Sequence, residues 1–300
     1  MEASRWVQSA LSGVASGFLS VLTLYPLDIV RTRLQVQHVI KGKTHTSSLI
    51  QTTTELYRQR GVRGFYQGLS TNLVGSSVAW GLYFAAFHGF QRRLSRHLDR
   101  NDDETSHRAD LPPLLNLVCG VGAGVLATTV TTPIWIVKTR IQVGDLQRGS
   151  VRYSGLLHGL RSIWGQEGLP GLTRGLVPAL WSTSHTAIQF MVYEELLKTF
   201  GADSSASVLL CAAASKTVAS ALTNPFQVIK ARIQIHSPGQ QAADATPFST
   251  SFLATARQAF RHEGVAGFYR GWTLALARTV PGSAFTLLLF EHFQRLSKHS

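Results

Sequence analysis

Three segments of this 300-residue chain share one pattern, which recurs about every 100 residues. Residues 26–35, 133–142 and 225–234 each begin with proline, carry basic residues five and seven positions later, and end in glutamine. A glycine-rich turn follows each of them at a similar distance, at 60–68, 167–175 and 263–271. Three copies in register are not expected by chance, so the chain is one module used three times.

The repeat predicts one domain built from three equivalent parts rather than two separate globular domains. Polar stretches at 99–104 and 201–205 suggest the linkers, which gives parts at 1–105, 106–202 and 203–300. Each part is expected to contain a long helix with an internal proline, a short amphipathic helix, a glycine turn and a second long helix. The short helices are predicted at 47–60, 154–165 and 250–262, and suit a membrane surface.

The composition favours a membrane protein, because only 15% of residues are charged while 44% are hydrophobic. Six stretches are long enough to cross a bilayer as tilted helices, a length of roughly 20 residues or more. They lie at 8–36, 69–95, 112–143, 174–199, 206–234 and 271–297. We therefore predict an all-α membrane protein with six transmembrane helices in three pseudo-symmetric repeats; a soluble helical bundle is the alternative.

The net charge of +13 sits in the repeated motifs and in the loops between the apolar stretches. A nucleic-acid-binding protein usually gathers its basic residues on a polar domain with interleaved aromatics, so this class is not expected. The charge instead indicates an anionic substrate, anionic lipid headgroups, or both. The two cysteines, Cys119 and Cys211, have no metal-ligand spacing, and no catalytic constellation is recognisable, so we expect neither an enzyme nor a metal protein.

Proline inside a long helix removes a backbone hydrogen bond and bends the helix. Pro26, Pro133 and Pro225 are therefore expected to kink three equivalent helices at one level. If the three parts close around an axis, the kinks converge and shut one end of a central cavity, where the charged residues that follow the prolines face one another.

The proline motifs and the glycine turns resemble those of the mitochondrial carrier family over essentially the whole chain. The resemblance implies a six-helix carrier that exposes one central site to either side in turn, with salt-bridge networks closing each end. Within the family, residues 80–84 and 184–194 look like the FAD and folate carriers. The motif at 133–140 is shared with carriers of NAD and pyrimidine nucleotides and does not separate the branches.

The resemblance also implies a matrix gate, and this chain departs from its usual pattern. Family members usually carry an acid two residues after each proline, but here only Asp28 is acidic while Trp135 and Gln227 fill the other positions. By family analogy Asp28 pairs with Lys138, and Arg31 and Lys230 are left with neutral partners such as Gln227. The glutamines that end the motifs are expected to brace this gate by hydrogen bonds; they are Gln35, Gln142 and Gln234.

The gate at the opposite end, on the cytoplasmic side, is expected to be weaker. By family analogy the gate keeps both charges only in the second repeat, as Glu195 with Lys198, whereas the third repeat has Glu291 with the neutral Gln294.

Ionisable residues within spans are costly and mark transport pathways by default. On this ground Arg278, Lys216 and His185 are predicted to contact the substrate; Arg278 also matches a substrate-contacting position of related nucleotide carriers. Ser182 and Thr183 are the analogous contacts on the fourth long helix and leave room for a ring system. Three aromatic residues are candidates for stacking on an adenine, isoalloxazine or pterin ring: Trp80, Tyr83 and Trp135.

The sequence thus predicts a carrier that moves FAD or folate across the mitochondrial inner membrane by alternating access. A carrier of NAD or pyrimidine nucleotides and a non-transporting membrane scaffold are the alternatives, and the chloroplast envelope and the peroxisomal membrane are alternative locations. The resemblance implies a monomer with cardiolipin as its lipid partner. No catalytic cofactor and no nucleic-acid partner are expected.

Overall fold

The computed structural model describes residues 2–41, 48–98, 113–144, 146, 153–201, 205–235, 251–278 and 282. Within these ranges it describes the side chains except at 2–15, 37–41, 98, 113–114 and 205–206. The described residues form helices joined by turns. In chain order the elements are α1 (Glu2–Lys41), α2 (Leu49–Arg60), η1 (Val62–Tyr66), α3 (Leu69–Leu98), α4 (Pro113–Val143), α5 (Leu156–Leu172), α6 (Leu176–Phe200), α7 (Ser205–Gln234), α8 (Phe252–Glu263) and η2 (Val265–Tyr269). A further helical segment covers 272–278.

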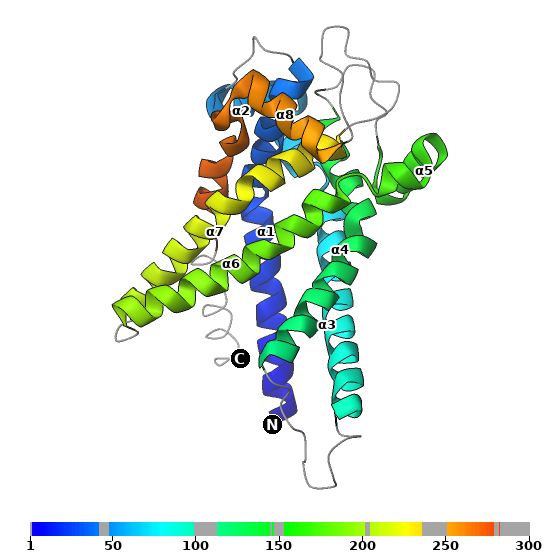
Figure 1. Ribbon diagram of the computed structural model, residues 1–300. Coiled ribbons are helices and arrows are strands. Elements are labelled where there is room, and N and C mark those ends of the chain that lie inside the picture. The colour runs from blue at the N-terminus through cyan, green and yellow to red at the C-terminus, as the bar shows by residue number, and fades with distance from the viewer. Residues whose placement is uncertain are drawn as a thin grey trace.

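The helices α1, α4 and α7 are equivalent elements of the repeat, and each continues through its internal proline, Pro26, Pro133 or Pro225. All three contact one another, and α3 packs along α4 as α6 packs along α7. Figure 1 shows the two pairs spreading apart away from the end where α2 and α8 lie. Among the described helices, α1, α4 and α7 therefore meet at the end that carries the proline motifs, which we call the closed end.

The short helices predicted between the long ones are present as α2, α5 and α8. Ser48 is the N-cap residue of α2 and forms a capping box with Gln51. The Ser48 hydroxyl accepts from the Gln51 backbone amide at 3.3 Å, and the Ser48 backbone amide donates to the Gln51 side-chain oxygen at 3.0 Å. The range of α5 is longer than predicted because a second helical turn follows Gly168, whose φ of 64° breaks the helix. Of the predicted stretch at 271–297, only 271–278 and 282 lie among the described residues.

Each glycine turn uses two glycines at positive φ, a region that side chains with a Cβ rarely occupy. The first of each pair ends a short helix, and the second precedes the next long helix. The first set is Gly61, Gly168 and Gly264 at φ 61° to 64°, and the second is Gly68, Gly175 and Gly271 at φ 75° to 77°. The periodic glycines of the sequence are thus required by the backbone in all three repeats.

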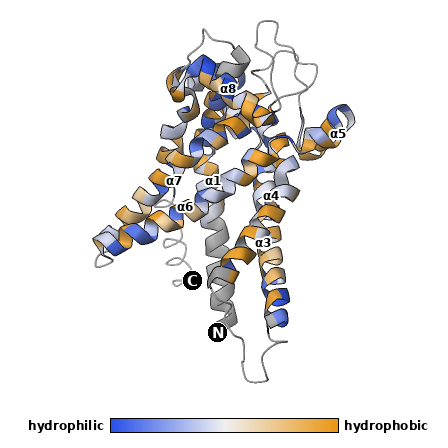
Figure 2. Cartoon of the chain, in the orientation of Figure 1, coloured by the Kyte–Doolittle hydropathy of each residue, from blue (hydrophilic) through white to orange (hydrophobic). Residues whose placement is uncertain are grey.

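Large apolar side chains remain exposed along the long helices, which is unusual for a soluble monomer. On α4 and α7 they include Leu117, Val118, Val121, Leu209 and Leu210, each more than half exposed. Figure 2 shows the corresponding apolar stretches on α3, α4 and α7. Among the described residues, Val62–His97 and Leu115–Val143 are long and apolar enough to cross a membrane, with mean hydropathies of 1.2 and 1.6.

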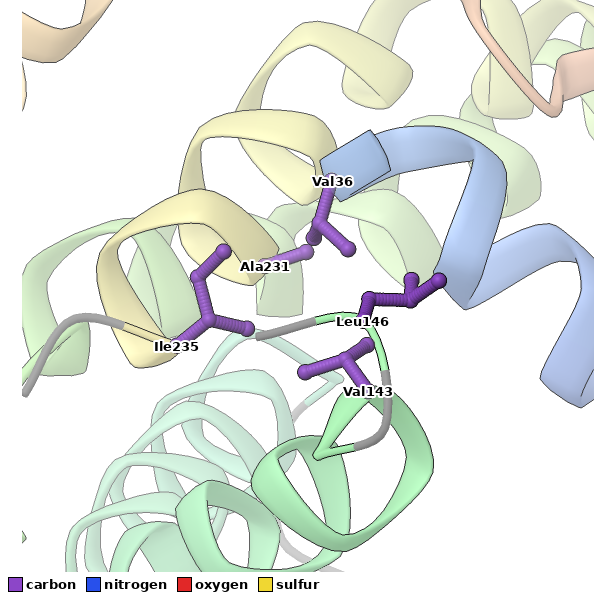
Figure 3. Packing of buried hydrophobic residues seen from close by; sticks show 5 residues of the cluster. All are labelled: Val36, Val143, Leu146, Ala231 and Ile235. Atoms are coloured by element: carbon purple, nitrogen blue, oxygen red, sulfur yellow. The ribbon is translucent and has the colours of Figure 1, made fainter. Parts of the chain in front are cut away.

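Buried aliphatic residues fill the place where the three proline-containing helices end together. Val36, Val143 and Ile235 each follow the last glutamine of a motif, and none of them is exposed. With Leu146 and Ala231 they form one apolar cluster, which we call the aliphatic plug (Figure 3). The plug seals the closed end of the molecule with groups that exclude water.

Candidate functional site

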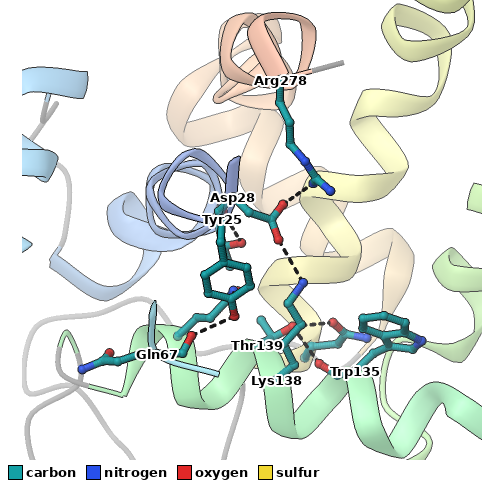
Figure 4. A network of polar contacts seen from close by, with 10 residues as sticks. Tyr25, Asp28, Gln67, Trp135, Lys138, Thr139 and Arg278 are labelled. Atoms are coloured by element: carbon teal, nitrogen blue, oxygen red, sulfur yellow. Dashed lines mark hydrogen bonds and ion pairs between the residues drawn. The ribbon is translucent and has the colours of Figure 1, made fainter. Parts of the chain in front are cut away.

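Asp28 on α1 is the centre of the polar contacts inside the closed end. Lys138 on α4 donates to its Oδ2 at 3.0 Å, and Arg278 donates to its Oδ1 at 2.5 Å (Figure 4). The side chains of Asp28 and Lys138 are 12% and 14% exposed, so water screens this pair weakly. The structure places the expected partners together. It also adds Arg278, which sequence reasoning assigned to the substrate alone.

A cavity of about 250 Å³ lies among the three proline motifs, and we call it the motif chamber. All eight residues predicted for the matrix gate line it: Asp28, Arg31, Gln35, Lys138, Gln142, Gln227, Lys230 and Gln234. Arg31 donates to the side-chain oxygen of Gln227, the neutral partner expected for it. The Lys230 ammonium has no hydrogen bond or ion pair to any residue that the structure describes.

The three motif glutamines differ in their side-chain contacts. Gln142 donates to the Tyr25 hydroxyl at 3.1 Å, and that hydroxyl donates to the Gln67 carbonyl at 2.9 Å. Gln234 accepts from the Thr139 hydroxyl at 3.1 Å. Gln142 and Gln234 thus join neighbouring helices as braces, whereas the amide nitrogen of Gln35 has no partner in the described part of the chain.

The backbone carbonyls of the same glutamines form a closed ring of contacts that the sequence reasoning missed. Arg33 on α1 donates to the carbonyl of Gln142 on α4, and Arg140 on α4 donates to that of Gln234 on α7, both at 3.0 Å. Arg232 on α7 completes the ring by donating to the Gln35 carbonyl on α1 at 3.1 Å. The second basic residue of each motif therefore links its helix to the next helix around the axis.

Two of these arginines are also tied to the glycine turn of their own repeat. Glu167 binds Arg140 at 2.5 Å and Arg174 at 2.6 Å. In the third repeat Glu263 binds Arg232 at 2.8 Å and Arg270 at 3.0 Å. In both repeats this glutamate directly precedes the first glycine of the turn, and its recurrence is the sequence feature that could have predicted these ion pairs. The first repeat departs from this pattern, since it has Arg60 and Gln67 where the others have glutamate and arginine.

A second cavity, of about 520 Å³, adjoins the motif chamber and shares Arg31 and Gln227 with it. We call it the central cavity. Lys216, His185 and Arg278 also line it, and none of the described residues around it is acidic. Lys216 donates to the Gln189 side chain at 2.9 Å, and His185 lies 2.9 Å from the Thr223 hydroxyl. The structure thus brings the three predicted ionisable residues into one space.

The remaining predicted substrate contacts are spread over other places. Trp135 lines the motif chamber, where its ring lies 5.3 Å from the Lys138 ammonium, and Ser182 lines the same chamber. Trp80, Tyr83 and Thr183 line neither cavity. Tyr83 faces α4, since its hydroxyl would be 3.5 Å from a Cβ at Gly120, and Trp80 is 62% exposed and stacks on Phe84. The structure therefore does not bring these two aromatic rings to the cations.

The predicted cytoplasmic gate is described only in its second repeat. Lys198 donates to Glu195 at 3.4 Å, but both residues are on α6 and their side chains are 70% and 74% exposed. This pair therefore joins no two helices. Glu291 and Gln294 lie outside the described residues.

Comparison with known proteins gives the same repeat. The model of the mitochondrial carrier protein family matches residues 2–98, 109–204 and 201–300. Folate transporter 1, chloroplastic, of Arabidopsis thaliana is 37% identical, over 99% of this chain and 98% of that protein. Nicotinamide adenine dinucleotide transporter 1, chloroplastic, of the same plant is 32% identical, over 96% and 91%. The mitochondrial FAD carrier protein FLX1 of Saccharomyces cerevisiae is 27% identical, over 96% and 94%.

The three family matches follow the three proline motifs and together cover almost the entire chain, and the folate transporter matches it from end to end. The chain therefore belongs to the mitochondrial carrier protein family.

Proposed function

We propose that this carrier crosses the membrane six times and transports FAD or folate by alternating access. The observation that carries the proposal is the central cavity, where Arg31, Lys216 and Arg278 surround a space that no described acidic residue lines. Such a site favours a solute with more than one negative charge. The diphosphate of FAD and the two carboxylates of folate both meet this requirement.

The size of the cavity is also compatible with a cofactor-sized solute. Its volume of about 520 Å³ falls within the range usual for ligand pockets, roughly 300–1,000 Å³. Arginine binds phosphate and carboxylate groups through two parallel hydrogen bonds, and Arg278 is the arginine whose side chain is 42% exposed. We therefore assign the anionic group of the substrate to Arg278 and Lys216.

Arg278 gives the proposed transport cycle a physical link between binding and opening. A ligand changes a conformational equilibrium only through a difference in its affinity for the two states. A substrate anion that takes Arg278 away from Asp28 leaves that carboxylate with Lys138 alone. The closed end then loses one of its two ion pairs at Asp28 when substrate binds.

A carrier of NAD is the second candidate, supported by a relative at 32% identity whose name gives that substrate. NAD also carries a diphosphate, so the same cations suit it. A pyrimidine nucleotide carrier and a non-transporting scaffold remain the further alternatives. The proposal places the protein in the mitochondrial inner membrane as a monomer with cardiolipin, with the chloroplast envelope and the peroxisomal membrane as alternatives.

Uptake into liposomes tests the proposal, with FAD, folate, NAD and pyrimidine nucleotides compared on the purified protein. Lys216→Gln is the informative variant, because among the described residues the Lys216 ammonium hydrogen-bonds only to Gln189, so that the variant leaves the Asp28 ion pairs intact. We expect it to reduce uptake at least tenfold, corresponding to about 1.4 kcal/mol of lost binding to the charged group. Arg278→Ala is expected to abolish uptake.

Lys198→Gln is the matched control, since it removes a lysine that is 70% exposed on α6 and should leave uptake unchanged. Full uptake by Lys216→Gln and Arg278→Ala would contradict the assignment of the site. Uptake of none of the four solute classes by the folded wild-type protein would contradict the proposed substrates.

A further inference from the structure

The motif chamber contains more positive than negative charge. The residues five positions after the three prolines are Arg31, Lys138 and Lys230, and all line the chamber. The residues two positions after the prolines are Asp28, Trp135 and Gln227, so one acid faces three bases. Arg278 adds a fourth positive charge from the adjoining cavity.

The single carboxylate in the chamber is already occupied. Both oxygens of Asp28 are engaged, one by Lys138 at 3.0 Å and one by Arg278 at 2.5 Å. Arg31 donates to the neutral Gln227, and the Lys230 ammonium has neither a hydrogen bond nor an ion pair with the described residues. The nearest acid to Arg31 is Asp28, which is already paired with two other cations. The chamber therefore holds an excess of positive charge in a poorly solvated space, an arrangement that costs free energy.

Hydrogen-bond donors in the same chamber are also left over. Arg31 Nε, Gln35 Nε2 and Gln234 Nε2 are buried and have no partner in the described part of the chain. Gln35 and Gln234 are 6% and 2% exposed, so bulk water does not reach them freely. A buried donor without a partner costs about 1–3 kcal/mol. A water molecule can accept a hydrogen bond from such a donor but does not change the excess positive charge. An anion accepts the hydrogen bonds and also neutralises that charge.

We propose that the motif chamber binds a small inorganic oxyanion of the phosphate type. The anion accepts hydrogen bonds from Arg31, Gln35 and Gln234 and supplies the negative charge that Lys230 lacks. The anion supplies negative charge to the chamber, where the residues at positions 135 and 227 are Trp135 and Gln227 instead of acids. The chamber volume of about 250 Å³ is large enough for such an ion, which enters through the central cavity that shares Arg31 and Gln227.

The bound anion acts on the closed end of the carrier. It joins α1 to α7, because Arg31 and Gln35 lie on the first helix and Lys230 and Gln234 on the other. These helices must separate when that end opens. The anion therefore stabilises the closed arrangement and slows its opening. Phosphate is thus expected to inhibit transport by binding in the motif chamber rather than in the central cavity.

Thermal unfolding of the purified full-length protein tests this without any organic substrate. Inorganic phosphate is added at constant ionic strength, with chloride as the reference anion. A ligand that binds only the folded state raises the Tm, and we expect a rise of roughly 2 °C at tens of millimolar phosphate. Lys230→Gln should lose this rise.

Gln227→Glu is the decisive variant, because it supplies the missing carboxylate within the chain. It should raise the Tm in chloride alone and abolish the additional effect of phosphate. Lys198→Gln, which removes an exposed lysine outside the chamber, should respond to phosphate like the wild type and so reports any general salt effect.

An equal rise with phosphate in the wild type, Lys230→Gln and Gln227→Glu would overturn the proposal. So would a rise in chloride equal to that in phosphate. Because these measurements contain no FAD, folate or nucleotide, their outcome is independent of whether the proposed substrate is transported. Phosphate bound in the central cavity instead of the motif chamber is distinguished by Lys216→Gln, because Lys216 lines only the central cavity. This variant should keep the phosphate response, and its loss would overturn the proposal.

Discussion

At the scale of single residues, Asp28 has a role that no other residue of the motifs shares. It receives one cation from α4 and one from the segment at 272–278, and its side chain is 12% exposed. The equivalent residues of the other repeats, Trp135 and Gln227, make a cation–π contact and a hydrogen bond instead. Among the described residues, the ion pairs inside the motif chamber therefore depend on one carboxylate.

This dependence predicts a large effect of Asp28→Asn. The substitution leaves Lys138 and Arg278 without their counter-charge in a poorly solvated site, and breaking such pairs costs about 3–5 kcal/mol. We expect a lower free energy of unfolding by about 3 kcal/mol, discounted to the lower end because the groups are partly exposed. Thermal unfolding measures it. Glu195→Gln, at a site 74% exposed, is the control and should unfold like the wild type; equal Tm values for both variants would contradict the argument.

At the scale of elements, the short helices α5 and α8 are held to the long ones by buried ion pairs as well as apolar contacts. In the second repeat Ile136 and Val137 of α4 pack against Ile163 of α5, and all three are fully buried. Beside this contact the Glu167 side chain, 0% exposed, binds both Arg140 and Arg174. The ion pairs fix α5 and its glycine turn at one position along α4.

Glu167→Gln should loosen this junction. The variant keeps the shape of the side chain but leaves Arg140, which is 3% exposed, without its carboxylate. We expect a loss of about 3 kcal/mol in the free energy of unfolding, together with faster proteolysis within 153–175. Gln166→Ala, the exposed neighbour on α5, is the control. If both variants were cut at the wild-type rate, α5 would not depend on this contact.

At the scale of the whole molecule, three layers close one end of the carrier. The ion pairs of Asp28 come first, the arginine–carbonyl ring of Arg33, Arg140 and Arg232 second, and the aliphatic plug last. The Asp28–Lys138 pair joins α1 to α4, and the arginine–carbonyl ring joins all three proline-containing helices. The aliphatic plug contains residues from the ends of all three helices. Opening this end therefore requires α1, α4 and α7 to move apart together.

Thiol accessibility tests this closure. Cys119 and Cys211 are 4% and 5% exposed, so the native cysteines should react little with a water-soluble thiol reagent. Val21→Cys in the central cavity should react readily, and Val143→Cys in the plug should not. Addition of transported substrate should make Val143→Cys reactive if the proposed alternating access opens the plug. Ready labelling of Val143→Cys without substrate would show that the plug is not a seal.

The sequence by itself determined the features that repeat. The three proline motifs predicted three equivalent helices, the glycine turns predicted the breaks between elements, and the family resemblance was confirmed by the comparisons. It also indicated the faces of single helices: Lys216 and Gln227, eleven residues apart on α7, line one cavity as the helical period requires. Such features depend on local geometry, which neighbouring residues largely specify.

The tertiary structure alone decided which distant side chains meet. Arg278 lies 250 residues from Asp28 in the chain, and the ring of Arg33, Arg140 and Arg232 joins residues 94 to 197 positions apart. Trp80 and Tyr83 have the spacing of a stacking pair, yet the packing of α3 on α4 directs Tyr83 away from the cavity cations. Helix period gives a residue's face, but the relative rotation and depth of whole helices depend on the packing of all of them at once.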